Sequence, residues 1–206
     1  MKQAILDLLS ARNGHFLFES GHHGDFWLDL ELLSRRPQAL EPLAGRLAEQ
    51  LAPFEVDSIC APLVEGAFVG LLVAQLMDRS FAYTLRSAKP SSGGLFPARY
   101  TVPAGLRQSL RGQRVAIVND VTNAGSAVKG TFADLEACGA HVVAIASLLD
   151  LGDAAARFAE EKKTPLVQLA AMPNNLWLPE TCPLCAAGVP LQDIDGFAAQ
   201  FQGRPV

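Results

Sequence analysis

Hydrophobic and polar positions follow one another along the chain in blocks that predict strands and helices in alternation. Short apolar runs, many of them β-branched, predict strands, and longer segments with apolar residues three or four positions apart predict helices. We expect strands at 56–61, 81–86, 115–118, 141–149 and 166–172, and helices at 2–11, 37–51, 126–138 and 152–163, with another apolar helix ending near Met77. This alternation predicts an α/β fold: a central parallel sheet flanked by helices on both faces.

The segment around residue 120 combines the clearest strand with the clearest candidate chemistry. Residues 115–118 are four consecutive apolar residues, which is typical of a strand buried on both faces. The run stops at Asn119-Asp120, so we expect polar groups to emerge there, at the carboxyl end of the strand. Small residues rich in hydroxyl and amide groups follow: Thr122, Asn123, Ala124, Gly125 and Ser126. Such a turn can direct backbone N–H groups and two hydroxyls, with the positive end of a helix behind them, toward a phosphate.

Two common nucleotide-binding patterns do not fit this turn. A dinucleotide fold would have G-x-G-x-x-G, and a P-loop would have a Lys beside the terminal Ser or Thr. The stretch Asn119-Asp120-Val121-Thr122-Asn123-Ala124-Gly125-Ser126 instead resembles the signature with which type I phosphoribosyltransferases bind 5-phosphoribosyl 1-diphosphate (PRPP). An ordinary strand-to-helix turn of an α/β domain is the alternative.

Composition and charge restrict the other classes of function. With 206 residues, half of them hydrophobic, the chain is expected to fold as one domain. A net charge of −4 and no cluster of Lys and Arg argue against a nucleic-acid partner. No apolar run reaches membrane-spanning length and the N-terminus lacks the core of a signal peptide, so we expect no membrane partner and a cytoplasmic location. Four unevenly spaced cysteines are consistent with a reducing compartment.

The resemblance extends to the orotate phosphoribosyltransferases over nearly the whole chain. Residues 14–30 of this chain are predicted to form a hairpin of two strands. Within it, Ser20-Gly21, followed by Phe26-Trp27 and Asp29, is similar to the start of these enzymes. Residues 177–190 are similar to the C-terminal end of a bacterial subset. The resemblance implies one phosphoribosyltransferase-like domain in which 1–35 and 173–206 form a small hood and tail. The irregular segment 87–112 is predicted to be a lid loop hinged at Gly93-Gly94.

The resemblance also implies roles for individual residues. Catalytic roles fall on Lys89 and on Asp120, which would face the positive charge that develops at the anomeric carbon. Lys129 would bind the base. Residues implied to bind PRPP are Arg86, Asn119, Asp120, Val121, Thr122, Asn123, Ala124, Gly125 and Ser126, and those implied to form the diphosphate loop are Val64, Glu65 and Gly66.

The implied reaction transfers a 5-phosphoribosyl group from PRPP to a nucleobase. Orotate is the first candidate, which would give orotidine 5′-monophosphate and diphosphate, with Mg²⁺ bound through the diphosphate and a homodimer as the assembly. Glu19 and Lys129 stand where the family usually has Lys and Arg, which favours another base as an alternative. Asn119, Leu85 and the absence of the usual loop His favour a second alternative, a PRPP- or nucleotide-binding protein without catalysis.

The motif Cys182-Pro183-Leu184-Cys185 is a candidate metal or redox pair. Zinc would need two further ligands, and the other cysteines, Cys60 and Cys138, lie in predicted core elements. A symmetric pair of chains could supply four thiolates, and a structural turn is the alternative. His22 and His23 are adjacent on a predicted strand, so at most one of them can face a given site. We therefore assign no metal ligand beyond the possible pair Cys182 and Cys185.

Overall fold

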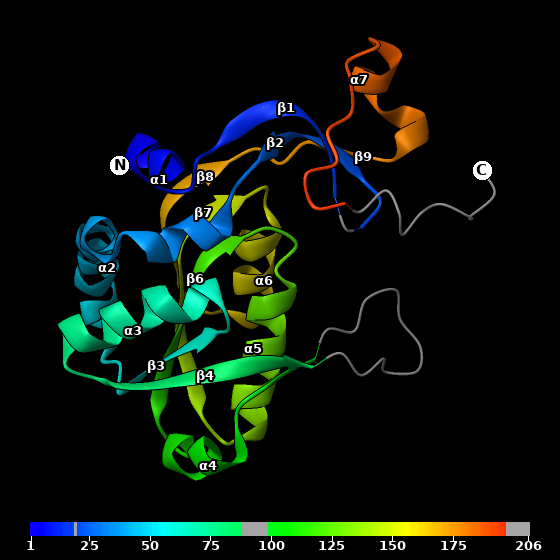
Figure 1. Ribbon diagram of the computed structural model, residues 1–206. Coiled ribbons are helices and arrows are strands. Elements are labelled where there is room, and N and C mark those ends of the chain that lie inside the picture. Colours follow the sequence, from blue (N-terminus) through cyan, green and yellow to red (C-terminus); the bar gives the residue numbers. More distant parts are fainter. Residues whose placement is uncertain (19, 88–98, 197–206) are drawn as a thin grey trace.

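A six-stranded sheet forms the body of the protein in the computed structural model, which describes residues 1–18, 20–87 and 99–196 (Figure 1). The strand order is β5-β4-β3-β6-β7-β8. Their bounds are β3 (Ser58–Pro62), β4 (Ser80–Ser87), β5 (Arg99–Thr101), β6 (Arg114–Thr122), β7 (His141–Leu151) and β8 (Leu166–Met172). Five strands are parallel, and β5 pairs antiparallel with β4 at the edge. The predicted α/β fold is confirmed, with one antiparallel edge strand added.

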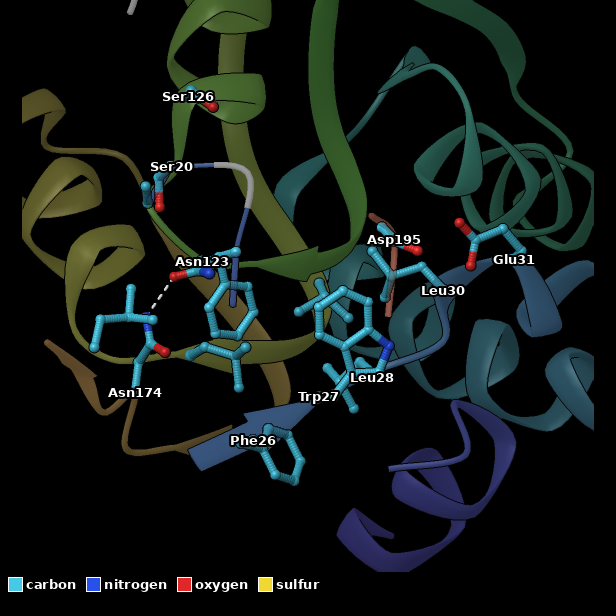
Figure 2. A pocket seen from close by; sticks show the side chains of 15 residues that line it. Ser20, Phe26, Trp27, Leu28, Leu30, Glu31, Asn123, Ser126, Asn174 and Asp195 are labelled. Atoms are coloured by element: carbon cyan, nitrogen blue, oxygen red, sulfur yellow. Dashed lines mark hydrogen bonds between the residues drawn. The ribbon is translucent and has the colours of Figure 1, made fainter. Parts of the chain in front are cut away.

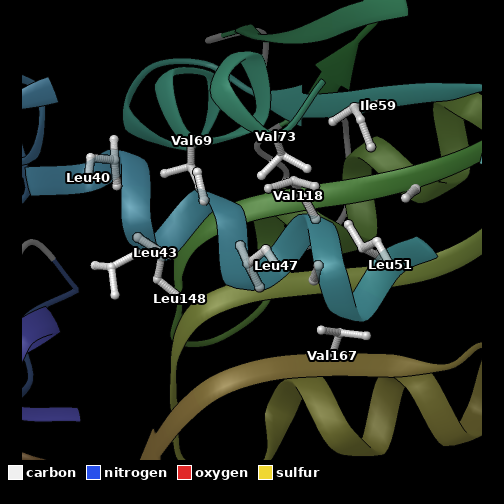
Figure 3. Packing of buried hydrophobic residues seen from close by; sticks show 14 of the residues in the cluster. Leu40, Leu43, Leu47, Leu51, Ile59, Val69, Val73, Val118, Leu148 and Val167 are labelled. Atoms are coloured by element: carbon white, nitrogen blue, oxygen red, sulfur yellow. The ribbon is translucent and has the colours of Figure 1, made fainter. Parts of the chain in front are cut away.

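Successive strand residues point to opposite sides of the sheet, so its apolar strands make both faces hydrophobic. Helices cover both of these faces. Ala116 and Val118 of β6 join the core beneath α1 (Lys2–Leu8), α2 (Pro37–Leu51) and α3 (Glu65–Met77). Val115 and Ile117 face α5 (Ser126–Ala137) and α6 (Ala154–Lys162). Figure 3 shows the leucines of α2 packed along the sheet. No helix in the described residues is both long and apolar enough to cross a bilayer.

A second, smaller sheet is built from both ends of the chain. It has the order β1-β2-β9, all antiparallel, and lies across one end of the body, at the top of Figure 1. Its strands are β1 (Arg12–Leu17), β2 (His23–Trp27) and β9 (Leu176–Trp177). Beyond β9 come a 3₁₀ turn at Pro179–Thr181 and the short α7 (Pro183–Ala186). We call residues 12–35 and 174–196 the hood.

The backbone of Gln192 fastens the last described segment to the first strand. Its N–H donates to the His15 carbonyl at 2.7 Å, and its own carbonyl accepts from the Leu17 N–H at 3.1 Å. The predicted hairpin at residues 14–30 is therefore present, and a strand and a bridging segment from the far end of the chain complete it.

One sequence expectation about the central strand is wrong. Strand β6 continues past its apolar run to Thr122, and Asn119 and Asp120 are each only 5% exposed. The cause is the neighbouring strand: β7 extends to Leu151, so β6 keeps pairing as far as the Thr122–Asp150 partners. The polar groups are thus buried within the sheet and do not emerge from it.

The predicted lid range, 87–112, contains regular structure in its second half. Residues 99–101 form β5, Ala104–Arg107 form α4, and Gln108–Leu110 form a 3₁₀ turn. The remaining part of that range, including Lys89 and the Gly93-Gly94 hinge, lies outside the described residues, as does Glu19. Their predicted roles stay predictions.

Candidate active site

Three predicted site residues lie at the carboxyl ends of adjacent parallel strands. Glu65 begins α3 directly after β3, Arg86 is near the end of β4, and Asp120 is near the end of β6. Because these strands are parallel and adjacent, their carboxyl ends meet at one edge of the sheet, where α/β proteins bind ligands. Burial raises the pKa of Tyr100, while the charge of Arg86 lowers it and that of Asp120 raises it; the pKa of Asp120 is raised by burial and in addition by the charge of Glu65. These charges therefore act on one small region.

Asp120 is a buried carboxyl group with an unusual protonation equilibrium. Burial raises its pKa from 3.8 to about 7, against the opposing effect of two backbone hydrogen bonds at Val121 and at Asp120 itself. The charge of Glu65 adds to the increase. Because the carboxyl group is poised between its neutral and charged forms near neutral pH, small changes in local charge shift its state.

Asn119 links the central strand to the first turn of α3. Its Nδ2 donates to the Val121 carbonyl at 2.9 Å. Its Oδ1 lies so close to Gly66 that a Cβ added there would collide with it. The preceding Leu63–Val64 peptide is cis, and the Leu63 N–H donates to the Thr84 carbonyl at 2.9 Å. The predicted diphosphate loop, 64–66, and the predicted PRPP stretch are therefore in direct contact.

The turn after β6 leads into α5 through a glycine in the left-handed conformation. Gly125 adopts φ 77°, a left-handed conformation that favours glycine, and α5 begins at the next residue. Asn123 is held from outside the turn, because Asn174 donates its side-chain N–H to the Asn123 Oδ1 (Figure 2). The first N–H groups of α5 have no acceptor within the helix. They are available to an anion that sits in the turn.

Two polar atoms lie buried beneath this turn. Among the described residues, Thr122 Oγ1 and Asp150 Oδ2 make no hydrogen bond of accepted geometry. The two groups still act on each other. Burial raises the pKa of Asp150, and the Ser147 and Thr122 hydroxyls partly oppose this increase. Ser147 Oγ donates to Asp150 Oδ1 at 2.6 Å.

A cavity of about 480 Å³ lies between this turn and the hood (Figure 2). The turn contributes Val121, Asn123, Ala124 and Ser126 to its lining. The hood contributes Phe18, Ser20, Phe26, Trp27, Leu28, Leu30, Glu31, Asn174, Leu176 and Asp195, and β7 contributes Leu151. The rings of Phe18 and Trp27 stack with centroids 5.5 Å apart. Aromatic walls with a few polar groups are typical of a site for a flat organic ring.

Several lining residues were not predicted from the sequence. Asn174, Asp195 and Glu31 had no assigned role, and no local pattern marks them, because the hood's pairing brings Asn174 and Asp195 from the far end of the chain. Burial and the neighbouring Glu31 raise the pKa of Asp195, with further contributions from Asp29 and Asp193. The rim of the cavity on this side is therefore acidic.

Lys129 and the two hood cysteines do not line the cavity. The ammonium group of Lys129 lies 5.8 Å from the centroid of the Phe158 ring, on the α6 side of α5. Its role in binding a base stays a prediction. Cys182 and Cys185 lie in the hood near α7, apart from the residues that line the cavity.

Solved structures of two other proteins have the same fold as this chain. Orotate phosphoribosyltransferase from Aeropyrum pernix aligns with a TM-score of 0.65 over 84% of this chain and 94% of that one, at 19% identity. Adenine phosphoribosyltransferase from Thermoanaerobacter pseudethanolicus aligns with a TM-score of 0.60 over 72% and 89%, at 22% identity. The fold is that of the type I phosphoribosyltransferases.

Proteins similar in sequence show to which family of phosphoribosyltransferases the chain belongs. The orotate phosphoribosyltransferase of Carboxydothermus hydrogenoformans is 31% identical over 192 residues, which cover 92% of this chain and 90% of that protein. That of Wolinella succinogenes is 28% identical over 200 residues, covering 91% and 92%. The sequence matches no family model. On these similarities the chain belongs to the orotate phosphoribosyltransferase family.

Proposed function

We propose that this protein transfers the 5-phosphoribosyl group of PRPP to orotate, giving orotidine 5′-monophosphate and diphosphate. A ring nitrogen of the base forms a bond to the anomeric carbon, and the bond from that carbon to the diphosphate oxygen breaks. The diphosphate leaves with the electron pair. The observation that carries the proposal is the buried Asp120, placed directly before a small-residue turn that opens into the cavity beneath the hood.

The sugar phosphate has a suitable place at the turn. Residues 122–126 would supply backbone N–H groups and the Ser126 hydroxyl, and the left-handed conformation of Gly125 leads the chain into α5 there. From there, the ribose would extend toward Asp120 and the base toward Phe26 and Trp27 in the hood.

Asp120 would stabilise the developing positive charge of the ribose. A carboxylate about 5 Å from a unit positive charge is worth roughly 3 kcal/mol at an effective dielectric of 20, or about two decades in rate. Its neighbour Asn119 keeps hydrogen-bonding capacity but has no charge. The electrostatic part of catalysis in this pair therefore falls on Asp120 alone.

Magnesium fits the oxygen donors present at this edge. Glu65 and Asp120 are carboxylates close enough for Glu65 to raise the pKa of Asp120, and hard divalent cations prefer oxygen ligands. When bound with PRPP, Mg²⁺ would offset charge on the diphosphate. Arg86 adds a positive charge at the end of β4, and Lys89, outside the described residues, is proposed to do so from the lid.

Two further functions are favoured by specific observations. Lys129 lies beside Phe158 and not in the cavity lining, which favours a base without the carboxylate of orotate. Asn119 and Leu85 favour a protein that binds PRPP without turnover. We also propose a cytoplasmic location and a homodimer, supported by the resemblance to orotate phosphoribosyltransferases; light scattering after size-exclusion chromatography tests the dimer.

The deciding experiment is a panel of diphosphate release with PRPP and Mg²⁺. Orotate, uracil, adenine and hypoxanthine are compared with the wild-type protein and with Asp120→Asn, and PRPP binding is measured separately by thermal shift. We expect turnover with orotate and a loss of about two decades in Asp120→Asn. Turnover with another base alone would support the first alternative, and binding without turnover the second. A protein that neither binds PRPP nor releases diphosphate would refute the proposal.

A further inference from the structure

Four potential metal ligands meet in the hood, outside the cavity. His15 lies on β1 and His23 on β2, whereas Cys182 and Cys185 flank the start of α7. One ligand atom from each residue falls within 4.8 Å of all the others. Three of the four residues are buried, and only Cys185 is exposed. Residues more than 150 positions apart have thus been brought together around one point.

The spacing of these atoms matches a tetrahedral zinc site. His15 Nε2 lies 3.1 Å from His23 Nδ1, 3.4 Å from Cys182 Sγ and 3.7 Å from Cys185 Sγ. Cys185 Sγ lies 3.2 Å from His23 Nδ1. With Zn–N near 2.0 Å and Zn–S near 2.3 Å, a tetrahedron separates two nitrogens by about 3.3 Å and a nitrogen from a sulfur by about 3.6 Å. These four of the six edges agree with a tetrahedron to within about 0.4 Å, and the other two pairs of atoms lie within 4.8 Å of each other.

The orientation of His15 is fixed by a backbone acceptor. His15 Nδ1 lies 2.8 Å from the Val189 carbonyl. Because a carbonyl only accepts hydrogen bonds, Nδ1 carries the proton and Nε2 presents a lone pair to the cluster. Zinc-bound histidines have this arrangement, with the second ring nitrogen held by a backbone carbonyl or a carboxylate.

Hydrogen bonds alone do not account for this convergence. The single lone pair of His15 Nε2 has three partners within 3.7 Å: His23 Nδ1 and the two sulfurs. One lone pair serves one donor well, so the other contacts would be left without a partner. A cation at the centre satisfies all four atoms. Two thiolates and two neutral imidazoles also balance Zn²⁺, which makes the complex neutral and suited to a buried place.

We propose that His15, His23, Cys182 and Cys185 bind one zinc ion, which fastens the C-terminal segment to the β1–β2 hairpin. The protein fills all four positions, so the site is structural and leaves no open position for chemistry. The two ligands that the cysteine pair lacks are the histidines of the hairpin, and neither Cys60, Cys138 nor a second chain is needed. Phe18 and Trp27 line the cavity from the same hairpin, so the ion would support one wall of that cavity.

The test is the metal content of the full-length protein, which is independent of the proposed enzymatic function. We expect about one zinc per chain by inductively coupled plasma mass spectrometry after gel filtration. Cys185→Ser, at the exposed ligand, should reduce this to near zero. His22→Ala is the matched control, because the His22 ring contacts Ser20 Oγ and not the cluster; this variant should retain the zinc.

A second measurement does not depend on the folding of a variant. Zinc removed from the wild-type protein with a chelator should lower the melting temperature, and Zn²⁺ but not Mg²⁺ should restore it. Cobalt(II) in place of zinc should give the intense visible bands of a tetrahedral thiolate complex. Wild-type protein that holds no zinc after incubation with excess metal would overturn the proposal. Stoichiometric zinc in Cys185→Ser, or a Cys182–Cys185 disulfide in the protein as purified, would also overturn it.

Discussion

The buried carboxyl group of Asp120 should make the stability of this protein fall as the pH rises. An Asp in the unfolded chain ionises with a pKa of 3.8, whereas burial keeps Asp120 protonated in the folded state up to about pH 7. Between these values the folded state binds one more proton than the unfolded state, so each increase in pH favours unfolding. The effect ends above the folded-state pKa, where both states are ionised.

The size of this effect follows from the two pKa values. A difference from 3.8 to about 7 corresponds to about 4 kcal/mol in the free energy of unfolding at alkaline pH. Between about pH 5 and pH 8, where the protein can be compared without acid denaturation, the loss is about 2–3 kcal/mol. The full value applies because Asp120 is buried and not screened by solvent.

Asp120→Asn isolates this contribution, because an amide of similar shape is neutral at every pH. Urea denaturation at several pH values should show the stability of the variant rising by about 2–3 kcal/mol relative to the wild-type protein between about pH 5 and pH 8. Asp153→Asn is the control: Asp153 is an exposed acid paired with Arg157, and its removal should change stability by less than about 1 kcal/mol. A constant difference between wild type and Asp120→Asn across this range would show that Asp120 does not carry the raised pKa.

Three further predictions test the same edge of the sheet. The kcat/KM of the wild-type enzyme should rise with pH through about 7, since ionised Asp120 stabilises the transition state and kcat/KM reports the free enzyme; a flat profile would contradict this role. Gly66→Ala should cost roughly 1–3 kcal/mol in urea denaturation, because the new Cβ collides with Asn119 Oδ1. Gly45→Ala in α2, with open space around it, should instead stabilise by up to about 1 kcal/mol. Asn119→Asp should raise kcat by up to about 100-fold while costing about 1–3 kcal/mol through the lost bond to Val121; an unchanged rate would contradict the charge argument.

Elements with a clear hydrophobic period could be predicted closely from the sequence. Helix α2 spans Pro37–Leu51 and strand β8 spans Leu166–Met172, as expected, because local spacing determines which face of each is buried. The prediction for the end of β6 was wrong because that end depends on a contact with a distant strand and not on local spacing. Asn119 and Asp120 look like residues outside a strand, and only the non-local pairing with β7 keeps them in the sheet.

The candidate site was predictable where it depends on one continuous stretch. Residues 119–126 are contiguous, so their composition predicts a turn beneath a helix N-terminus. The other wall of the cavity depends on contacts between distant segments, such as Asn174 with Asn123. The His15, His23, Cys182 and Cys185 cluster was missed for the same reason, because no local spacing relates a hairpin to a segment more than 150 residues later.

The small sheet affects the order in which strands can pair while the chain is being synthesised. Strands β1 and β2 leave the ribosome before the strands of the large sheet, whereas β9 and the segment at Gln192 that pair with them leave after those strands. A nascent chain can therefore assemble its large sheet while the hairpin still waits for its partners. The cavity is therefore covered by the complete small sheet only after all six strands of the large sheet have been synthesised.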